Sequence, residues 1–313
     1  MNRQTENKIV LVTRKSRLDD LIQRFNTEGQ ARFYVEHLGA DFSDYLLEHQ
    51  RYRQAVFDAE QSLSRHGRVQ VVDRAFVPNF VFGGQDTVVA LGQDGLVANV
   101  LKYLTTQKLV GVNPDPARWE GVLLPFVVRD LDRVLPEVFA EKRRVREITM
   151  AQATLNTGES LCAVNDLFIG PRSHTSARYE ISCGGQTEQQ SSSGIIVSTG
   201  LGASGWLRSV IAGASGIVSA LSGAADDAAA EMADFSWESD YLYFSVREPW
   251  PSKTSSSAIS FGQVTPASPL TLVSQMPENG VIFSDGMEHD FVQFNAGTRA
   301  TISLAERRGL LVV

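Results

Sequence analysis

The stretch Asp86-Thr-Val-Val-Ala-Leu-Gly-Gln-Asp-Gly95 runs directly into Leu96-Val-Ala-Asn-Val-Leu-Lys-Tyr-Leu104. The run from Thr87 to Leu91 is short, uncharged and mostly β-branched, which is typical of a strand covered on both faces of a parallel sheet. Two glycines then turn the chain, and the residues after them have apolar side chains at helical spacing. The first helical amides would therefore point into the turn, where an anion can bind beside Asp94.

A second glycine motif, Gly83-Gly84-Gln85-Asp86-Thr87, lies just upstream of the same strand. Its Asp86 precedes the apolar run, whereas Asp94 follows it. Ligands of open α/β sheets bind at the carboxyl ends of the strands, so position favours Asp94. On the residues alone, an alternative stays open in which Gly92 to Gly95 form an ordinary tight turn whose aspartate caps the next helix.

Composition indicates a folded globular protein with one large or two ordinary domains. The chain has 313 residues, of which 43% are hydrophobic, and a formal net charge of −7. This charge argues against partners such as nucleic acid or an anionic membrane. Only Cys162 and Cys183 are present, without zinc-ligand spacing or a disulfide framework, which fits a reducing compartment. The first strand-like run begins at Ile9, which leaves no room for a signal or transit peptide, so we expect a cytoplasmic protein.

The pattern changes along the chain and predicts an α/β domain followed by an all-β domain. As far as Phe126, strand-like and helical segments alternate, as in a Rossmann-like parallel sheet. After Glu141, short apolar runs separated by turn residues predict a β-sandwich, whose main helix would lie near Trp206 to Leu221. The predicted domains are 1–128, carrying the Gly-Gln-Asp-Gly turn, and 129–313. Packing of the last residues against the first domain remains an option.

Several motifs occur in an order that matches one known family. They are Gly92-Gln-Asp-Gly95, Val110-Gly-Val-Asn-Pro-Asp-Pro-Ala-Arg-Trp-Glu-Gly121, Asn165-Asp-Leu-Phe-Ile-Gly170, Ser192-Ser-Gly-Ile-Ile-Val-Ser-Thr-Gly-Leu-Gly-Ala-Ser-Gly-Trp206, Ser245-Val-Arg-Glu-Pro249 and Ser284-Asp-Gly286. Over most of the chain they resemble the NAD kinase family, and specifically its mitochondrial-type branch, which also has bacterial members. The upstream Gly83 motif resembles only superficially the signature of the wider NAD kinase and diacylglycerol kinase superfamily. Lipid kinase activity is disfavoured because the matches after Gly111 are those of NAD kinases.

The resemblance implies a C-terminal domain of the NAD kinase type and phosphorylation of the 2′-hydroxyl of the adenosine ribose of NAD. Mg²⁺ would arrive with ATP, or polyphosphate would be the donor, and no residue is predicted to ligate a metal. Asp94 would be the catalytic base in a site between the domains. The nucleotide-binding residues would be Gly92, Gln93, Gly95, Asn165, Asp166, Thr199, Gly202, Ser204, Gly205 and Trp206. A homodimer is plausible from the same resemblance.

The sequence departs from the family pattern at four positions. Gln93 replaces a glycine beside the expected phosphate, and Asp166 replaces a glutamate, which shortens the carboxylate by one methylene. Leu201 and Ala203 replace Thr and Ser, which removes two hydroxyl groups. Three interpretations therefore stay open: an active NAD kinase, a kinase for another nucleotide or donor, and a non-catalytic NAD(P)(H)-binding sensor.

Overall fold

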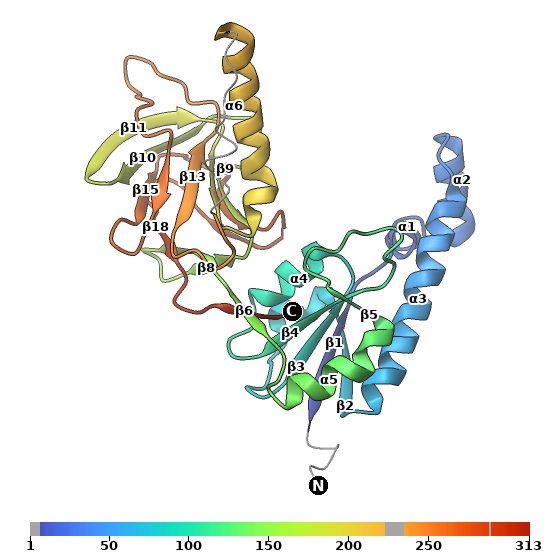
Figure 1. The fold of residues 1–313 in the computed structure, drawn as a ribbon. Helices are drawn as coiled ribbons and strands as arrows, with labels where there is room; N and C mark the ends of the chain where they lie inside the picture. Colours follow the sequence, from blue (N-terminus) through green and yellow to red (C-terminus); the bar gives the residue numbers. More distant parts are fainter. Residues whose placement is uncertain (1–6, 223–234, 288) are drawn as a thin grey trace. The chain divides into compact units, whose positions relative to one another are not determined.

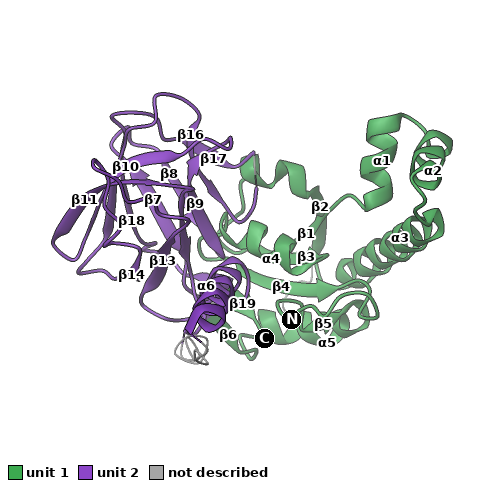
Figure 2. Cartoon of the chain, turned by 90° about the horizontal axis from the view of Figure 1, so that it is seen from above, with its two compact units in different colours: residues 1–146, 310–313 green, residues 147–309 purple. Residues whose placement is uncertain are grey.

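The computed structural model describes residues 7–222, 235–287 and 289–313 and contains two compact units (Figures 1 and 2). Unit 1 comprises residues 1–146 and 310–313, and unit 2 comprises residues 147–309. The division falls after Arg146 and not at the predicted residue 128. The reason is α5 (Leu131–Phe139), which buries Leu131, Val134, Leu135 and Val138 in the core of unit 1.

Unit 1 is built on a seven-stranded sheet in the order β2-β1-β3-β4-β19-β6, with β5 paired to β4. The strand pairs among β1 to β5 and between β19 and β4 are parallel. Its strands are β1 (Lys8–Thr13), β2 (Arg68–Asp73), β3 (Thr87–Leu91), β4 (Lys108–Asn113), β5 (Phe126–Val127), β6 (Val145–Ile148) and β19 (Gly309–Val312). Its other helices are α1 (Arg17–Phe25), α2 (Glu28–His37), α3 (Phe42–Ser64) and α4 (Asp94–Leu101), with 3-10 turns at Arg74–Asn79 and Val128–Asp130.

The sheet of unit 1 is covered on both faces, as the uncharged strand sequences predict. On one face, α3 and α5 pack on alternate residues of the central strands, including Leu11, Val89 and Val110. Figure 2 shows α4 on the opposite face, where it packs against β3 and β4. All five residues of β3 are buried. The carboxyl ends of β1, β3 and β4 consequently meet at one edge of a rigid sheet.

Unit 2 is a sandwich of two six-stranded antiparallel sheets, β11-β10-β15-β18-β7-β8 and β14-β13-β12-β9-β16-β17. The first sheet contains β7 (Ala151–Leu155), β8 (Ser160–Ala163), β10 (Ala177–Cys183), β11 (Gln186–Ser192), β15 (Leu270–Ser274) and β18 (Arg299–Leu304). The second contains β9 (Asp166–Pro171), β12 (Ile195–Ser198), β13 (Leu242–Val246), β14 (Phe261–Val264), β16 (Gly280–Ser284) and β17 (Phe291–Gln293). One apolar core joins them, with Tyr179 and Leu272 from the first sheet and Ile169 and Phe244 from the second.

The predicted exception to the β-structure of unit 2 is α6 (Trp206–Ser222), which follows a 3-10 turn at Gly202–Ser204. Within the described ranges, no helix has the length and hydrophobicity required to span a bilayer. The predicted fold class, an N-terminal parallel α/β sheet followed by antiparallel β-sheets, is confirmed.

Candidate active site

In unit 1, β3 and α4 position Asp94. The strand ends at Leu91, Gln93 is the N-cap residue of α4, and Asp94 is the first helical residue. Gln93 has φ −114° and ψ 166°, an extended conformation open to any side chain, so the replaced glycine causes no backbone strain. The negative side chain of Asp94 is favourable in the first helical turn.

The loop after β4 holds the carboxylate of Asp94 in place. Its Oδ1 accepts a hydrogen bond from the backbone N–H of Leu123 at 2.7 Å, and its Oδ2 accepts one from Val122 at 3.2 Å. Gly121, with φ +68°, turns the chain toward these bonds, and a Cβ at Gly111 would lie 2.0 Å from the carbonyl oxygen of Leu123. Both glycines of the Val110–Gly121 motif are therefore needed to bring this loop to Asp94.

In unit 2, Asn165 and Asp166 form the polar turn that leads into β9, and Asp285 organises it. The carboxylate of Asp285 accepts backbone N–H bonds from Val164, Asn165 and Asp166 at 3.0, 2.7 and 3.3 Å. Asp285 and Gly286 have φ of +53° and +68°, as in the type I′ hairpin turn that this dipeptide predicts. The sequence predicted the turn at Asp285 and Gly286. It gave no sign that the carboxylate of Asp285 holds the turn at Asn165.

Replacement of Asp285 by alanine is expected to lower the free energy of unfolding by about 2–3 kcal/mol, because three backbone donors lose their acceptor. Urea denaturation measures this loss. Asp285→Asn is the matched control, since asparagine tolerates positive φ and keeps one acceptor oxygen. It should lose clearly less than the alanine variant, and equal losses would show that the carboxylate bonds do not stabilise the turn.

Asp166 is held in a strongly perturbed environment. Its Oδ1 is buried and has no hydrogen-bond partner. Burial raises the pKa of Asp166 to about 7; the negative charge of Asp285 adds to the rise, and a hydrogen bond from Ser198 opposes it. A carboxyl group with this pKa changes protonation near neutral pH and can donate as well as accept a hydrogen bond.

The raised pKa predicts that Asp166 makes the fold less stable as pH rises. The unfolded carboxyl ionises near its model value of 3.8, whereas the folded one keeps its proton until about 7. Between these values the unfolded state binds fewer protons, so its free energy falls by about 1.4 kcal/mol per pH unit relative to the native state, to a limit of ~4 kcal/mol. Asp166→Asn should be more stable than wild type at pH 8 and show little difference at pH 4.

Urea denaturation of both proteins across this pH range tests the expectation. Asp240→Asn, at an exposed position of the same unit, is the control and should follow the wild-type profile. A constant stability difference between Asp166→Asn and wild type from pH 4 to pH 8 would contradict it.

The glycine-rich segment after β12 packs directly on the Asn165 turn. The backbone N–H of Thr199 donates to the carbonyl oxygen of Asn165 at 3.0 Å, and the Thr199 hydroxyl donates to the carbonyl of Val164. A Cβ at Gly202 would lie 2.3 Å from the carbonyl oxygen of Asn165. The segment and the turn therefore form one rigid surface, with Ser204 and Gly205 exposed next to it.

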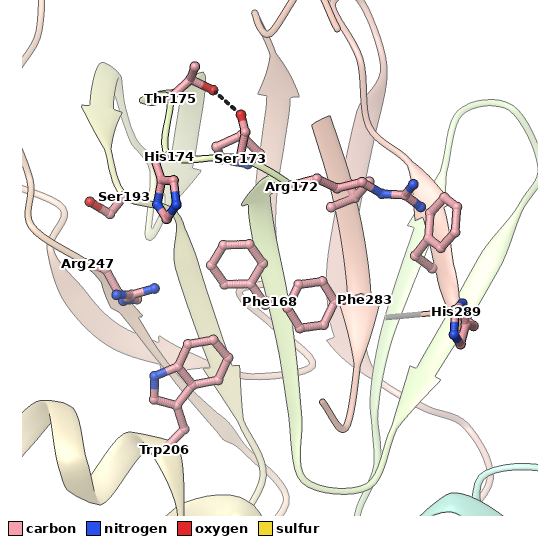
Figure 3. A pocket seen from close by; sticks show the side chains of 13 residues that line it. Phe168, Arg172, Ser173, His174, Thr175, Ser193, Trp206, Arg247, Phe283 and His289 are labelled. Carbon is pink, nitrogen blue, oxygen red and sulfur yellow. Dashed lines mark hydrogen bonds between the residues drawn. The ribbon is translucent and has the colours of Figure 1, made fainter. Parts of the chain in front are cut away.

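A cavity of about 680 Å³ on the outer face of the second sheet includes Trp206 (Figure 3). Trp206 stacks on Phe168 with ring centroids 5.7 Å apart, and Phe168 stacks on Phe283 at 4.8 Å. Arg247 lies over the Trp206 ring, 5.4 Å from its centroid. A Cβ at Gly170 would approach the Phe168 ring to 2.7 Å, so the glycine provides space for this ring.

The walls of this cavity combine aromatic rings with cationic groups. His174 and His289 also line it. A planar aromatic ligand with negative charge fits such a cavity, because it can stack on the rings and pair with arginine.

The predicted site residues fall into two groups. Gly92, Gln93, Asp94 and Gly95 lie together in unit 1; the others, from Asn165 to Trp206, lie in unit 2. Within unit 2 the structure brings the Asn165 turn and the glycine-rich segment into contact. Asp86 lies at the amino end of β3, as its position before the apolar run predicts, and it pairs with Lys8 at 2.9 Å.

The architecture defines a class of protein with a parallel α/β unit, whose acidic glycine turn ends a central strand, and a β-sandwich unit. It is the fold of NAD kinases. An NAD kinase from Archaeoglobus fulgidus in complex with ATP matches with a TM-score of 0.58 and 14% identity, over 98% of this chain and 93% of that one. Yeast NADH kinase complexed with NADH matches with a TM-score of 0.55 and 14% identity, over 98% and 83%. No family model and no curated protein matches the sequence.

Proposed function

We propose that the protein is an ATP-dependent NAD kinase, which transfers a phosphoryl group to the 2′-hydroxyl of the adenosine ribose of NAD or NADH. The observation that carries the proposal is the carboxylate of Asp94, fixed by two backbone N–H groups at the first turn of α4. It lies at the carboxyl edge of a parallel sheet, where phosphate groups and their acceptors bind in α/β proteins. The shared fold supports it.

In this proposal, Asp94 accepts the proton of the ribose hydroxyl and orients its oxygen for in-line attack. The amides of Gln93 and Gly95 would bind phosphate beside Gly92, whose own N–H donates to the carbonyl of Val112 at 3.1 Å. Mg²⁺ would arrive with ATP, coordinated by its phosphates. In the described residues, no three His, Cys, Asp or Glu side chains are grouped as metal ligands. The bound ion would neutralise negative charge on those phosphates.

In the proposed kinase, unit 2 recognises the nucleotide. Asn165 and Asp166 offer an amide and a carboxyl group for the ribose hydroxyls and the base. The backbone from Thr199 to Gly205, with the exposed Ser204, would approach the nucleotide closely, and the Trp206 ring would stack on one of its bases. The cavity at Trp206 supports this part, because its rings and arginines suit a dinucleotide with a pyrophosphate. A homodimer is also part of the proposal, and light scattering measures it.

A second candidate is a non-catalytic NAD(P)(H)-binding sensor. It is favoured by one observation: both oxygens of the Asp94 carboxylate already accept backbone hydrogen bonds, so a purely structural role for this residue is available. The second candidate retains the dinucleotide site of unit 2 and lacks phosphoryl transfer.

The test is NADP(H) production by purified protein with NAD or NADH, Mg²⁺ and either ATP or polyphosphate, measured with a cycling dehydrogenase. Product formation identifies the kinase and its donor. A thermal shift with dinucleotide but no product with either donor would establish the sensor.

A further inference from the structure

A chain of ion pairs borders the carboxyl edge of the unit 1 sheet. Four arginines alternate with three carboxylates in it, in the order Arg14, Glu48, Arg17, Asp44, Arg118, Asp115 and Arg51. We refer to these seven residues as the arginine ladder. It links the segment after β1 and the segment after β4 to helix α3, and its formal charge is positive because the arginines outnumber the acids by one.

Asp44 and Glu48 are held in their charged state, because their pKa values are lowered. Hydrogen bonds from Arg118 and Arg17 hold the pKa of Asp44 far below its ordinary value. Glu48 is buried and is shared by two arginines, since Arg14 and Arg17 each contact one of its oxygens. One negative charge thus faces two positive charges at the end of the ladder occupied by Arg14.

Arg14 lies beside the turn that carries Asp94. In the parallel register of β1 and β3, Val12 is level with Ala90, which places Arg14 level with Gly92. A Cβ at Gly92 would lie 3.6 Å from the Cδ of Arg14 and 2.8 Å from the Cδ2 of Leu96, so the arginine and the leucine both pack beside this glycine. Arg14 therefore lies beside Gly92, in the turn that leads into α4.

The position of Arg14 is fixed by its surroundings. Its backbone N–H donates to the hydroxyl of Tyr52 at 2.8 Å, and this hydroxyl donates to the carbonyl of Leu91 at 2.9 Å. Burial raises the pKa of Tyr52 to about 12, so the phenol keeps the proton that it donates. The guanidinium lies over the Tyr52 ring, 4.9 Å from the ring centroid.

The guanidinium of Arg14 nevertheless retains an unused donor. Its side chain is only 10% exposed; Nη1 donates to the carbonyl of Lys15, and Nη2 donates to Glu48. Its Nε is buried and has no partner. A buried N–H without an acceptor is costly, and a phosphate oxygen would supply the acceptor that the Nε–H of this arginine lacks.

We propose that Arg14 binds the phosphate chain of the phosphoryl donor beside the Gly92 turn and thereby positions it for transfer. This inference rests on the proposed function and adds a donor-binding residue to it. The ladder supports the role because it holds the guanidinium still beside the turn that begins α4, where anions bind.

The test compares the binding of inorganic tripolyphosphate, Mg-ATP and NAD to wild type, Arg14→Gln and Arg51→Gln by calorimetry. Arg14→Gln should bind tripolyphosphate and Mg-ATP roughly 10- to 100-fold more weakly, as expected for loss of a charged hydrogen-bond donor, with NAD affinity within about twofold. Arg51→Gln is the matched control, because it removes the same charge from the far, half-exposed end of the ladder. It should change each affinity by less than about twofold.

Arg14→Lys keeps the fold testable if loss of the charge beside Glu48 prevents folding of the glutamine variant. It preserves a cation but not the Nε donor and should bind tripolyphosphate about fivefold more weakly. A direct reading comes from wild type, in which the NMR signal of the Arg14 Nε–H, assigned by its loss in Arg14→Lys, should shift when tripolyphosphate is added.

Each alternative result has a distinct meaning. Unchanged tripolyphosphate affinity in both Arg14 variants, or an equal loss in Arg51→Gln, overturns the inference. An equal loss of NAD and tripolyphosphate affinity in Arg14→Gln overturns its assignment to the donor. Arg14-dependent binding of tripolyphosphate without any NADP production supports the inference and overturns the kinase. NADP production with an unchanged KM for ATP in Arg14→Gln supports the kinase and overturns the assignment of Arg14 to the donor.

Discussion

Asp94→Asn is expected to reduce NADP production by at least about 10²-fold, and by as much as ~10⁴-fold if proton transfer limits the reaction. Asparagine has nearly the shape of aspartate but cannot accept the ribose proton at neutral pH. Its single carbonyl oxygen can still accept the bond from Leu123, so the loop after β4 keeps its main contact. Dinucleotide binding, measured by calorimetry, should therefore change little while kcat falls.

The matched control is Asp86→Asn, at the opposite end of the same strand. Asp86 pairs with Lys8 and accepts the N–H of Gly83 at 2.8 Å, so its replacement should lower stability. Activity per folded molecule should stay at the wild-type level. If the Asp86 variant lost turnover and the Asp94 variant retained it, the assignment of the base would be reversed.

Gly202→Ala is expected to destabilise unit 2 by about 3 kcal/mol and to abolish dinucleotide binding. The added methyl group would lie 2.3 Å from the carbonyl oxygen of Asn165 and 2.7 Å from its carbonyl carbon. Both atoms are backbone, so the clash can be relieved only if the turn and the glycine-rich segment move apart. Such a movement would also break the bond between Thr199 and Asn165.

Gly213→Ala provides the control for this prediction. Gly213 lies in α6, and a Cβ there meets nothing within 4 Å. Alanine in place of glycine in a helix should raise stability by up to about 1 kcal/mol. Thermal unfolding followed by circular dichroism measures both variants, and an equal effect of the two substitutions would remove the steric argument.

The sequence predicted those parts of the fold that depend on local pattern. Strand β3 has the predicted bounds, Thr87–Leu91, because an uncharged β-branched run ends at a glycine. Strand β11 (Gln186–Ser192) has no such signal: its sequence is polar throughout, and it exists because it pairs with β10 at the edge of the sheet. For strand β19, the sequence left open whether the last residues pack against the first domain, since the place of this strand beside β4 depends on contacts distant in sequence.

The same distinction applies to the candidate site. The turns at Asp94, Asn165 and Asp285 could be located because glycine, asparagine and aspartate have definite backbone preferences. The hydrogen bond from the backbone N–H of Asn165 to the carboxylate of Asp285 could not be predicted, because it joins residues 120 positions apart. The unused donor of Arg14 was equally out of reach, since it is defined by what surrounds a single nitrogen atom.

The position of β19 in the sheet of unit 1 affects the order of events on the ribosome. This strand lies between β4 and β6, yet all of unit 2 is translated before it. At ordinary elongation rates of about 5–20 residues per second, Lys108 and Leu109 of β4 would wait roughly 10–40 s for their partner β19. During that interval the amino end of β4 is open to pairing with another nascent chain, so chaperone demand should be highest before β19 emerges.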